Sequence, residues 1–187
     1  MPQSLRSHSD QQLYALVLER GTLARAAFNE IYQRHSMRVF TYCRRIIGDS
    51  DAAQDMFQET FVRFFESATP DREMTNLPGY LLRIARNLCL AERKKLNRQT
   101  VSFEEFRFPS HDASYDSAEL IKLVETALES LKEDYREAYV LKEFLGLSYN
   151  EIAEMTGANL ALVRVRIYRA KTQIREILAP YIEDLEK

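Results

Sequence analysis

The sequence predicts an all-α protein built from two small helical domains that a flexible linker joins. Apolar residues recur at helical spacing along most of the 187 residues, and strand-like alternation is nearly absent. Only five glycines and five prolines interrupt the pattern. Residues 99–117 lack helical spacing, contain Pro109 and are acidic, which is typical of a linker. We therefore place the two domains at residues 10–98 and 118–179.

Four helices are predicted in the first domain, each with an apolar stripe. Gly21 is expected to end the first helix and Thr22 to cap the second. The acidic start of the third helix suits the positive end of a helix dipole. Residues 67–78 are expected to form a loop because they are rich in Pro, Ser, Thr and Asn. The predicted helices cover residues 10–20, 51–65 and 79–98, with a long one from Thr22 to about residue 47.

The second domain begins with two predicted helices at residues 118–131 and 133–145, and Gly146 is expected to stop the second. Their apolar residues supply a core for the stretch that follows. Phe144 is counted among these core residues because it fits the helical stripe of its segment.

Residues 147–175 are expected to form two short helices joined by a tight turn. Ser148 and Glu151 have the spacing of a capping box. Gly157 suits the left-handed conformation of a helix C-cap, and Asn159 can cap the next helix. On that second helix the apolar residues face a core and the cations point elsewhere. The apolar set is Val163, Ile167, Ala170, Ile174 and Leu178, and the basic set is Arg164, Arg166, Arg169, Lys171 and Arg175.

A glycine turn followed by a basic helix describes a helix-turn-helix that presents its second helix to a DNA major groove. The alternative is an ordinary helical hairpin with a solvated basic face. The helix at residues 79–98 is also strongly basic, with six cations against Glu92 alone, and has Tyr80 and Asn87 nearby. Such a helix is either a nucleic-acid surface, where an aromatic ring stacks on bases, or a solvated helix at the end of a domain.

Composition excludes several classes of protein. Cys43 and Cys89 are far apart and the three histidines are scattered, so we expect no metal, cofactor or disulfide framework. No Ser/His/Asp set, P-loop or glycine-rich phosphate loop is present, which argues against an enzyme. The polar N-terminus lacks a signal core, and no run approaches the roughly 18 apolar residues of a membrane span. We therefore expect a cytoplasmic protein without membrane insertion or a small-molecule substrate.

Both domains resemble bacterial sigma factors of the sigma-70 family, specifically the extracytoplasmic-function (ECF) group, over about residues 24–178 apart from the linker. Residues 51–61, DAAQDMFQETF, are similar to the region 2.2 helix. Residues 79–87, GYLLRIARN, are similar to regions 2.3 and 2.4, with Tyr80 where the family usually has tryptophan. Residues 148–171 are similar to the region 4.2 helix-turn-helix.

The resemblance implies a transcription initiation factor with no catalytic chemistry. Its implied partners are core RNA polymerase (through the β′ clamp helices and the β flap), promoter DNA and an anti-sigma factor. The loop at residues 67–77 is implied to capture a base flipped out of the −10 element. The implied polymerase-binding residues are Asp55, Gln58 and Glu59. The implied −10 residues are Tyr80, Arg83, Arg86, Asn87, Lys94, Lys95 and Arg98. The implied −35 residues are Arg164, Arg166, Tyr168, Arg169 and Lys171.

Two departures from the family pattern fall on the helix implied to read DNA. The usual Gly-Thr pair before the central valine is Ala161-Leu162 here, and Val165 replaces a frequent serine. The linker nevertheless has the required reach. Two DNA sites about one and a half turns apart lie roughly 50–60 Å from each other. A linker of this length spans roughly 60 Å at about 3.3–3.6 Å per residue.

Other assignments remain open at this point. The nearest is a helix-turn-helix regulator with a helical sensor domain, which would bind DNA without polymerase. A pure interaction module is less consistent with basic helices on both domains. The acidity of the linker suits either a positively charged channel on a partner or a loose screen for the basic helix before it.

Overall fold

The computed structural model describes residues 5–70, 73–99 and 117–185, with side chains at 5–70, 73–96 and 121–181. Within these ranges the regular elements are all helices and no strand is present. The chain divides into two compact units, Met1–Lys95 and Leu96–Lys187. These findings confirm the all-α prediction and the two helical domains. Residues 100–116 of the predicted linker lie outside the described residues, and the domain limits drawn from the sequence remain predictions.

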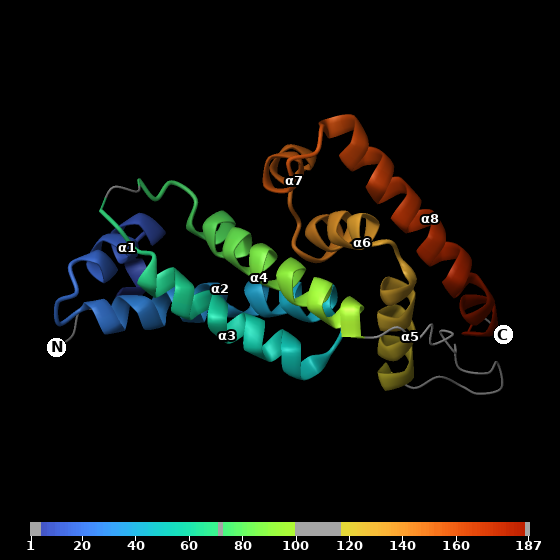
Figure 1. The fold of residues 1–187 in the computed structure, drawn as a ribbon, viewed down its shortest axis with the longest axis horizontal. Helices are drawn as coiled ribbons and strands as arrows, with labels where there is room; N and C mark the ends of the chain where they lie inside the picture. Colours follow the sequence, from blue (N-terminus) through green and yellow to red (C-terminus); the bar gives the residue numbers. More distant parts are fainter. Residues whose placement is uncertain (1–4, 71–72, 100–116, 186–187) are drawn as a thin grey trace. The chain divides into compact units, whose positions relative to one another are not determined.

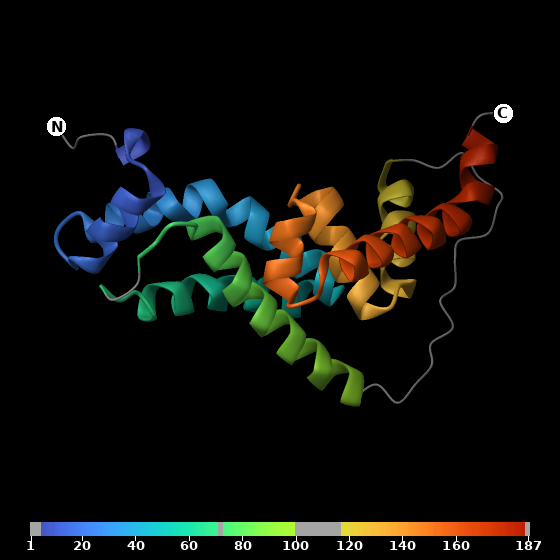
Figure 2. The same cartoon turned by 90° about the horizontal axis from the view of Figure 1, so that it is seen from above.

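In the described parts of the first unit, four α-helices form a bundle that follows one short 3-10 helix. Helices α2 and α3 run side by side in both views (Figures 1 and 2), and the α2–α3 turn contains Gly48. The elements are η1 (Leu5–Ser7), α1 (Asp10–Leu18), α2 (Ala24–Ile47), α3 (Ser50–Glu66) and α4 (Leu77–Gln99). The largest fully buried side chains of this unit are Leu13, Val17, Ile31, Tyr42, Phe64, Leu77, Leu81 and Leu82.

The connection between α1 and α2 differs from the prediction. Arg20, not Gly21, takes a left-handed conformation, with φ of 49°. Helix α2 starts at Ala24 behind Leu23, which forms no side-chain cap, so the predicted Thr22 cap is wrong. Sequence rules favour glycine at left-handed positions and threonine at helix N-caps. In the structure the left-handed Arg20 places its guanidinium 5.6 Å from the centre of the Phe65 ring.

Arg34 fastens the start of the chain to α2. Its guanidinium donates to the carbonyls of His8 at 2.8 Å and Arg6 at 2.9 Å. It also pairs with Asp10 at 3.2 Å and with Glu30, one turn earlier on α2, at 2.9 Å. A planar group with several fixed donors suits this task, because one side chain satisfies backbone carbonyls and carboxylates together.

Within the described residues 117–185, the second unit shows four α-helices and one π-helical segment. Helix α7 leads through a short turn into the long α8 (Figure 1). One cluster of its core consists of Leu128 and Leu131 packed against Ala170 and Ile174. The elements are α5 (Ser117–Ser130), α6 (Glu133–Tyr139), the π-helix η2 (Val140–Phe144), α7 (Tyr149–Thr156) and α8 (Leu160–Leu185).

The predicted single helix at residues 133–145 is wrong in its second half, which is π-helical. The amide of Leu145 donates to the carbonyl of Val140, five residues back. Because a π turn holds more residues than an α turn, Leu145 is buried while Phe144 is 38% exposed. The predicted core position of Phe144 is therefore wrong. Gly146 ends the segment with φ of 68°, as predicted.

Arg136 is buried at 2% exposure between α5 and α6. Its Nε donates to the carbonyl oxygen of Leu128 at 2.7 Å, and its Nη2 donates to the carbonyl oxygen of Glu129. These carbonyls belong to the last turn of α5, where intrahelical donors run out. The Leu128 carbonyl also accepts the Leu131 amide at 3.2 Å. The buried Arg136 side chain thus supplies donors to carbonyl groups at the C-terminal end of α5. The sequence alone did not indicate this role.

Candidate polymerase and nucleic-acid interfaces

The outer face of α3 carries the three residues predicted to bind polymerase. Asp55 and Gln58 are exposed, and the Glu59 side chain is 40% exposed. The opposite face of the helix is buried, including Phe57, Phe61 and Phe64. Glu59 pairs with Arg63 at 2.7 Å one turn later. Helical spacing therefore places Asp55, Gln58 and Glu59 together on one polar ridge.

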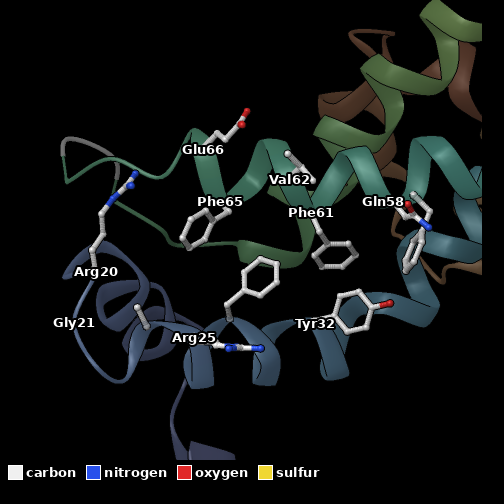
Figure 3. A pocket seen from close by; sticks show the side chains of 12 residues that line it. Arg20, Gly21, Arg25, Tyr32, Gln58, Phe61, Val62, Phe65 and Glu66 are labelled. Carbon is white, nitrogen blue, oxygen red and sulfur yellow. The ribbon is translucent and has the colours of Figure 1, made fainter.

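An apolar groove of about 720 Å³ lies on one side of this ridge, between α2 and α3. Figure 3 shows Phe61 and Phe65 pointing from α3 toward α2, whereas Glu66 points away. Phe65 is 37% exposed and meets Phe28 edge-on, with ring centroids 5.6 Å apart. Gln58 also lines this groove.

A second, more polar groove of about 500 Å³ lies on the other side of the ridge, between α3 and α4. It is lined from α3 by Asp55, Gln58 and Glu59, and from α4 by Asn87 and Lys95. The fold thus brings residues predicted for polymerase contact and residues predicted for −10 contact to a single groove. Because the two sets of residues are far apart in the sequence, the sequence alone did not indicate that they lie close together in space.

Helix α4 presents the predicted −10 residues unequally. Arg83, Asn87 and Lys94 are exposed, while Arg86 is partly buried. Lys95 is exposed and pairs with Glu92 at 2.8 Å. Arg98 belongs to α4, but its side chain lies outside the described residues. A residue of the same helix that was not among the predicted sites, Arg93, donates to the carbonyl of Ile46 and ties α4 to the end of α2.

Tyr80 is held against the end of α3. Its ring meets Phe64 edge-on at a centroid distance of 6.3 Å, and its hydroxyl bonds the hydroxyl of Ser67 at 2.8 Å. Ser67 is the first residue of the loop predicted to capture a flipped base. Tyr80 thus connects the start of that loop to α4. Asn76 closes the loop by accepting the Gly79 amide at 2.9 Å.

The helix-turn-helix of the second unit forms with the predicted caps. Ser148 and Glu151 make both hydrogen bonds of a capping box at the start of α7. Gly157 ends α7 in the left-handed conformation with φ of 71°. The Asn159 side chain accepts the Leu162 amide at 2.8 Å, which caps α8. These local contacts fix the turn that orients α8.

Three of the predicted −35 residues lie on the exposed side of α8. Arg164 is exposed, and its guanidinium lies 5.9 Å from the centre of the Tyr149 ring. Arg169 is also exposed and donates to the Tyr135 hydroxyl at 2.8 Å. Tyr168 is 72% exposed. These contacts hold the two guanidinium groups in place while leaving further donors directed to solvent.

The other two predicted −35 residues make ion pairs within the unit. Arg166 pairs with Asp134, and its side chain is only 17% exposed. Lys171 pairs with Glu143 at 2.8 Å, and the hydrogen bond to that carboxylate raises the pKa of the lysine above its ordinary value. Both cations therefore fasten α8 to the α6–η2 segment, which makes them supports for the helix.

The described part of the chain offers no alternative chemical centre. Cys43 and Cys89 are buried free thiols. No group of three or more His, Cys, Asp or Glu side chains within residues 5–70, 73–96 and 121–181 could hold a metal ion. Among the helices described, none combines the length and the apolar character needed to cross a bilayer.

Comparison with known proteins accounts for both units. The Sigma-70 region 2 family model matches residues 31–99, and the Sigma-70 region 4 family model matches residues 121–174. The ECF RNA polymerase sigma-E factor of Salmonella typhimurium is 31% identical over 170 residues, which cover 83% of this chain and 88% of that protein. The chain belongs to the ECF group of the sigma-70 family. This membership confirms the resemblance stated from the sequence.

Two further relatives and two solved structures agree with this assignment. RNA polymerase sigma factor CarQ of Myxococcus xanthus is 31% identical over 83% of this chain and 91% of its own length. ECF RNA polymerase sigma factor SigE of Mycolicibacterium smegmatis is 33% identical over 84% of this chain, which spans only 64% of that relative. RpoE of Bartonella quintana, solved with the anti-sigma factor NepR, shares the fold with a TM-score of 0.67 at 24% identity. The match covers 81% of this chain and 96% of the RpoE chain. CnrH, solved with the cytosolic domain of CnrY, shares the fold with a TM-score of 0.64 at 23% identity. The match covers 91% of this chain and 97% of CnrH.

The family decides between the functions that the sequence left open. Sigma factors are transcription initiation factors and not enzymes, so the prediction of a non-enzymatic protein is confirmed. A helix-turn-helix regulator with an unrelated sensor domain is not favoured, because the first unit itself matches sigma region 2. The residue roles implied by the family remain predictions for this chain.

Proposed function

We propose that this sigma factor binds core RNA polymerase through α3 and contacts a promoter at two places, through α4 at the −10 element and α8 at the −35 element. The observation that carries the proposal is that each unit presents its own exposed cationic helix. Phosphates attract such helices without regard to sequence, and groove contacts then add specificity. The cytoplasm, where bacterial RNA polymerase transcribes, is the proposed place of action.

The α3 ridge supports the polymerase contact. Asp55 is exposed and makes no ion pair among the described residues, so its charge is available to a partner. Gln58 lines both flanking grooves, which gives the ridge a recess on either side. A ridge with an apolar groove beside it suits a helical partner that buries aliphatic side chains and pairs its cations with carboxylates. The β′ clamp helices are the partner we propose for this surface, and the β flap is the partner we propose for the second unit.

The groove between α3 and α4 supports a link between polymerase binding and −10 contact. Because Asn87 and Lys95 line the same groove as Asp55 and Glu59, a partner on α3 lies next to the strand that α4 holds. Exposed Arg83 and Lys94 supply phosphate contacts on α4. We propose that Tyr80 orients the loop predicted at residues 67–77 through its hydrogen bond to Ser67, while the loop holds the flipped base.

The two arginines Arg164 and Arg166 are proposed to differ in role, and this difference can be measured. Replacing Arg164 by Ala is expected to cost about 1–3 kcal/mol of promoter binding and to relax the preference at one −35 base pair, if the guanidinium contacts a guanine edge. Replacing Arg166 by Ala removes a partly exposed ion pair with Asp134, worth about 0.2–1 kcal/mol of stability. Binding of both holoenzymes to a panel of single-base promoter variants distinguishes the two residues. An unchanged base preference in the Arg164→Ala holoenzyme would show that Arg164 does not contact a base of the −35 element.

An anti-sigma factor is a further proposed partner. RpoE of Bartonella quintana, which shares this fold, was solved in complex with one. The exposed apolar groove between α2 and α3 and the α3 ridge are surfaces that such a protein would cover to block polymerase.

Run-off transcription tests the proposed function. Purified chain, core RNA polymerase and a random promoter library are combined, and the transcribed templates are sequenced. We expect transcripts that depend on the chain and templates enriched at two elements separated by a fixed spacer. Enrichment at one element alone, or transcripts equal to those of core polymerase by itself, would contradict the proposal.

A further inference from the structure

The first two turns of α8 carry three exposed apolar side chains. Leu162 is 41% exposed and Val165 is 43% exposed, and Ala161 beside them is also exposed. The opposite side is fully buried, including Val163 and Ile167. An apolar strip on the solvent side of a helix gains nothing from the core of its own unit. In the first two turns of α8, this strip lies on the side that faces away from the core of the second unit.

We propose that Val165, with Ala161 and Leu162 beside it, reads thymine methyl groups in the major groove of the −35 element. This inference rests on the proposed function of α8. None of these three side chains can donate or accept a hydrogen bond, so they cannot read the polar edges of guanine, adenine or cytosine. The C5-methyl of thymine is the apolar group that a base pair exposes in the major groove.

The surrounding charges identify DNA as the occupant of this face. At about 100° per residue, Arg164 lies about 100° from Val165 on one side around the helix axis, and Arg169 lies about 40° from it on the other side. Both guanidinium groups are exposed, and both are held from behind, Arg164 by the Tyr149 ring and Arg169 by the Tyr135 hydroxyl. Cations on both sides of an apolar centre match the two phosphate backbones that border a major groove.

A protein partner on the same face is the competing occupant. A protein surface would use the strip as apolar contact area, and its binding would not depend on any group of the DNA. The thymine methyl can be removed from DNA without changing base pairing, because deoxyuridine differs from thymidine in that group alone. This substitution therefore separates the two occupants.

The test uses holoenzyme made from the full chain and core polymerase. A −35 element is first selected from a random duplex library, and synthetic promoters then carry deoxyuridine in place of thymidine at each position in turn. At one or more positions we expect deoxyuridine to weaken binding about fourfold, the factor that corresponds to burying one methyl-sized group. The Leu162→Ser/Val165→Ser variant is expected to bind both forms of each promoter equally. The Arg164→Ala variant, the matched control, is expected to lose affinity and keep the fourfold difference.

Three results would overturn the inference. A selected element without thymine would do so, as would equal binding of thymidine and deoxyuridine promoters by the wild type. A double serine variant that keeps the wild-type ratio would also do so. In all three cases selection of a −35 element by the holoenzyme leaves the proposed function standing. Failure of the holoenzyme to select any upstream element removes the proposed function and the inference together.

Discussion

Reversing the charge of Asp55 is expected to weaken binding to core RNA polymerase about tenfold to a hundredfold, which corresponds to about 1.4–2.7 kcal/mol. The Asp55 side chain is exposed on the α3 ridge and lines the groove between α3 and α4. An arginine there would face the cations that we propose for the partner, and like charges at an interface are strongly unfavourable. Fluorescence anisotropy of labelled chain titrated with core polymerase measures the change.

The fold is expected to survive the Asp55→Arg change, because no ion pair of Asp55 is present among the described residues. Circular dichroism checks this point. Glu19→Lys is the matched control, since Glu19 is an exposed carboxylate of the same unit that lies off α3. Equal affinities for wild type and Asp55→Arg would show that the ridge is not a polymerase contact.

The second large effect is expected at Arg136. Replacing it with Met should lower the free energy of unfolding of the second unit by about 1–3 kcal/mol, the cost of one buried polar group that loses its partner. The Leu128 carbonyl keeps the Leu131 amide as a donor at 3.2 Å, so the main loss is expected at Glu129. Methionine keeps much of the apolar stem but removes the donors to the Leu128 and Glu129 carbonyls. Amide hydrogen exchange of the full chain reports the local free energy of opening in α5 and α6.

The control for Arg136 is Lys132→Met, which removes an exposed cation at the start of α6. It should leave exchange in α5 unchanged to within about 0.5 kcal/mol. If Arg136→Met leaves the protection of α5 and α6 at wild-type values, the two carbonyl hydrogen bonds do not stabilise the unit.

The parts of the fold that were predictable depend on neighbours in sequence. The Ser148 and Glu151 side chains each bond the other residue's backbone, and the two residues are only three positions apart. The C-cap at Gly157 was predictable because glycine readily adopts the left-handed conformation that ends a helix. The helical stripes were predictable for the same reason, because spacing alone determines which side chains share a face. These local features include the helix-turn-helix on which the family resemblance partly rested.

The parts that were not predictable depend on residues far apart in sequence. Nothing near Arg166 or Lys171 indicates their ion pairs with Asp134 and Glu143, so the sequence placed all cations of α8 in one set. The π-helical turn at Val140–Phe144 changes which residues are buried without any signal in the apolar spacing. The ion pairs of Arg166 and Lys171 are tertiary contacts, and the part that each α8 cation plays in DNA binding remains a prediction.

The relation between α3 and α4 is another feature of the tertiary structure. Glu59 and Asn87 lie on different helices, yet they line the same groove. The family resemblance implies a polymerase contact for Glu59 and a DNA contact for Asn87, and we propose that the shared groove links the two contacts.

The most direct test of the account is DNase I protection of a selected promoter by the chain alone, by core polymerase alone and by the two together. The account predicts protection of both the −35 and −10 elements only when the chain and core polymerase are both present. Protection of the promoter by the chain alone, with no change on adding core polymerase, would contradict it and identify a regulator that binds DNA independently.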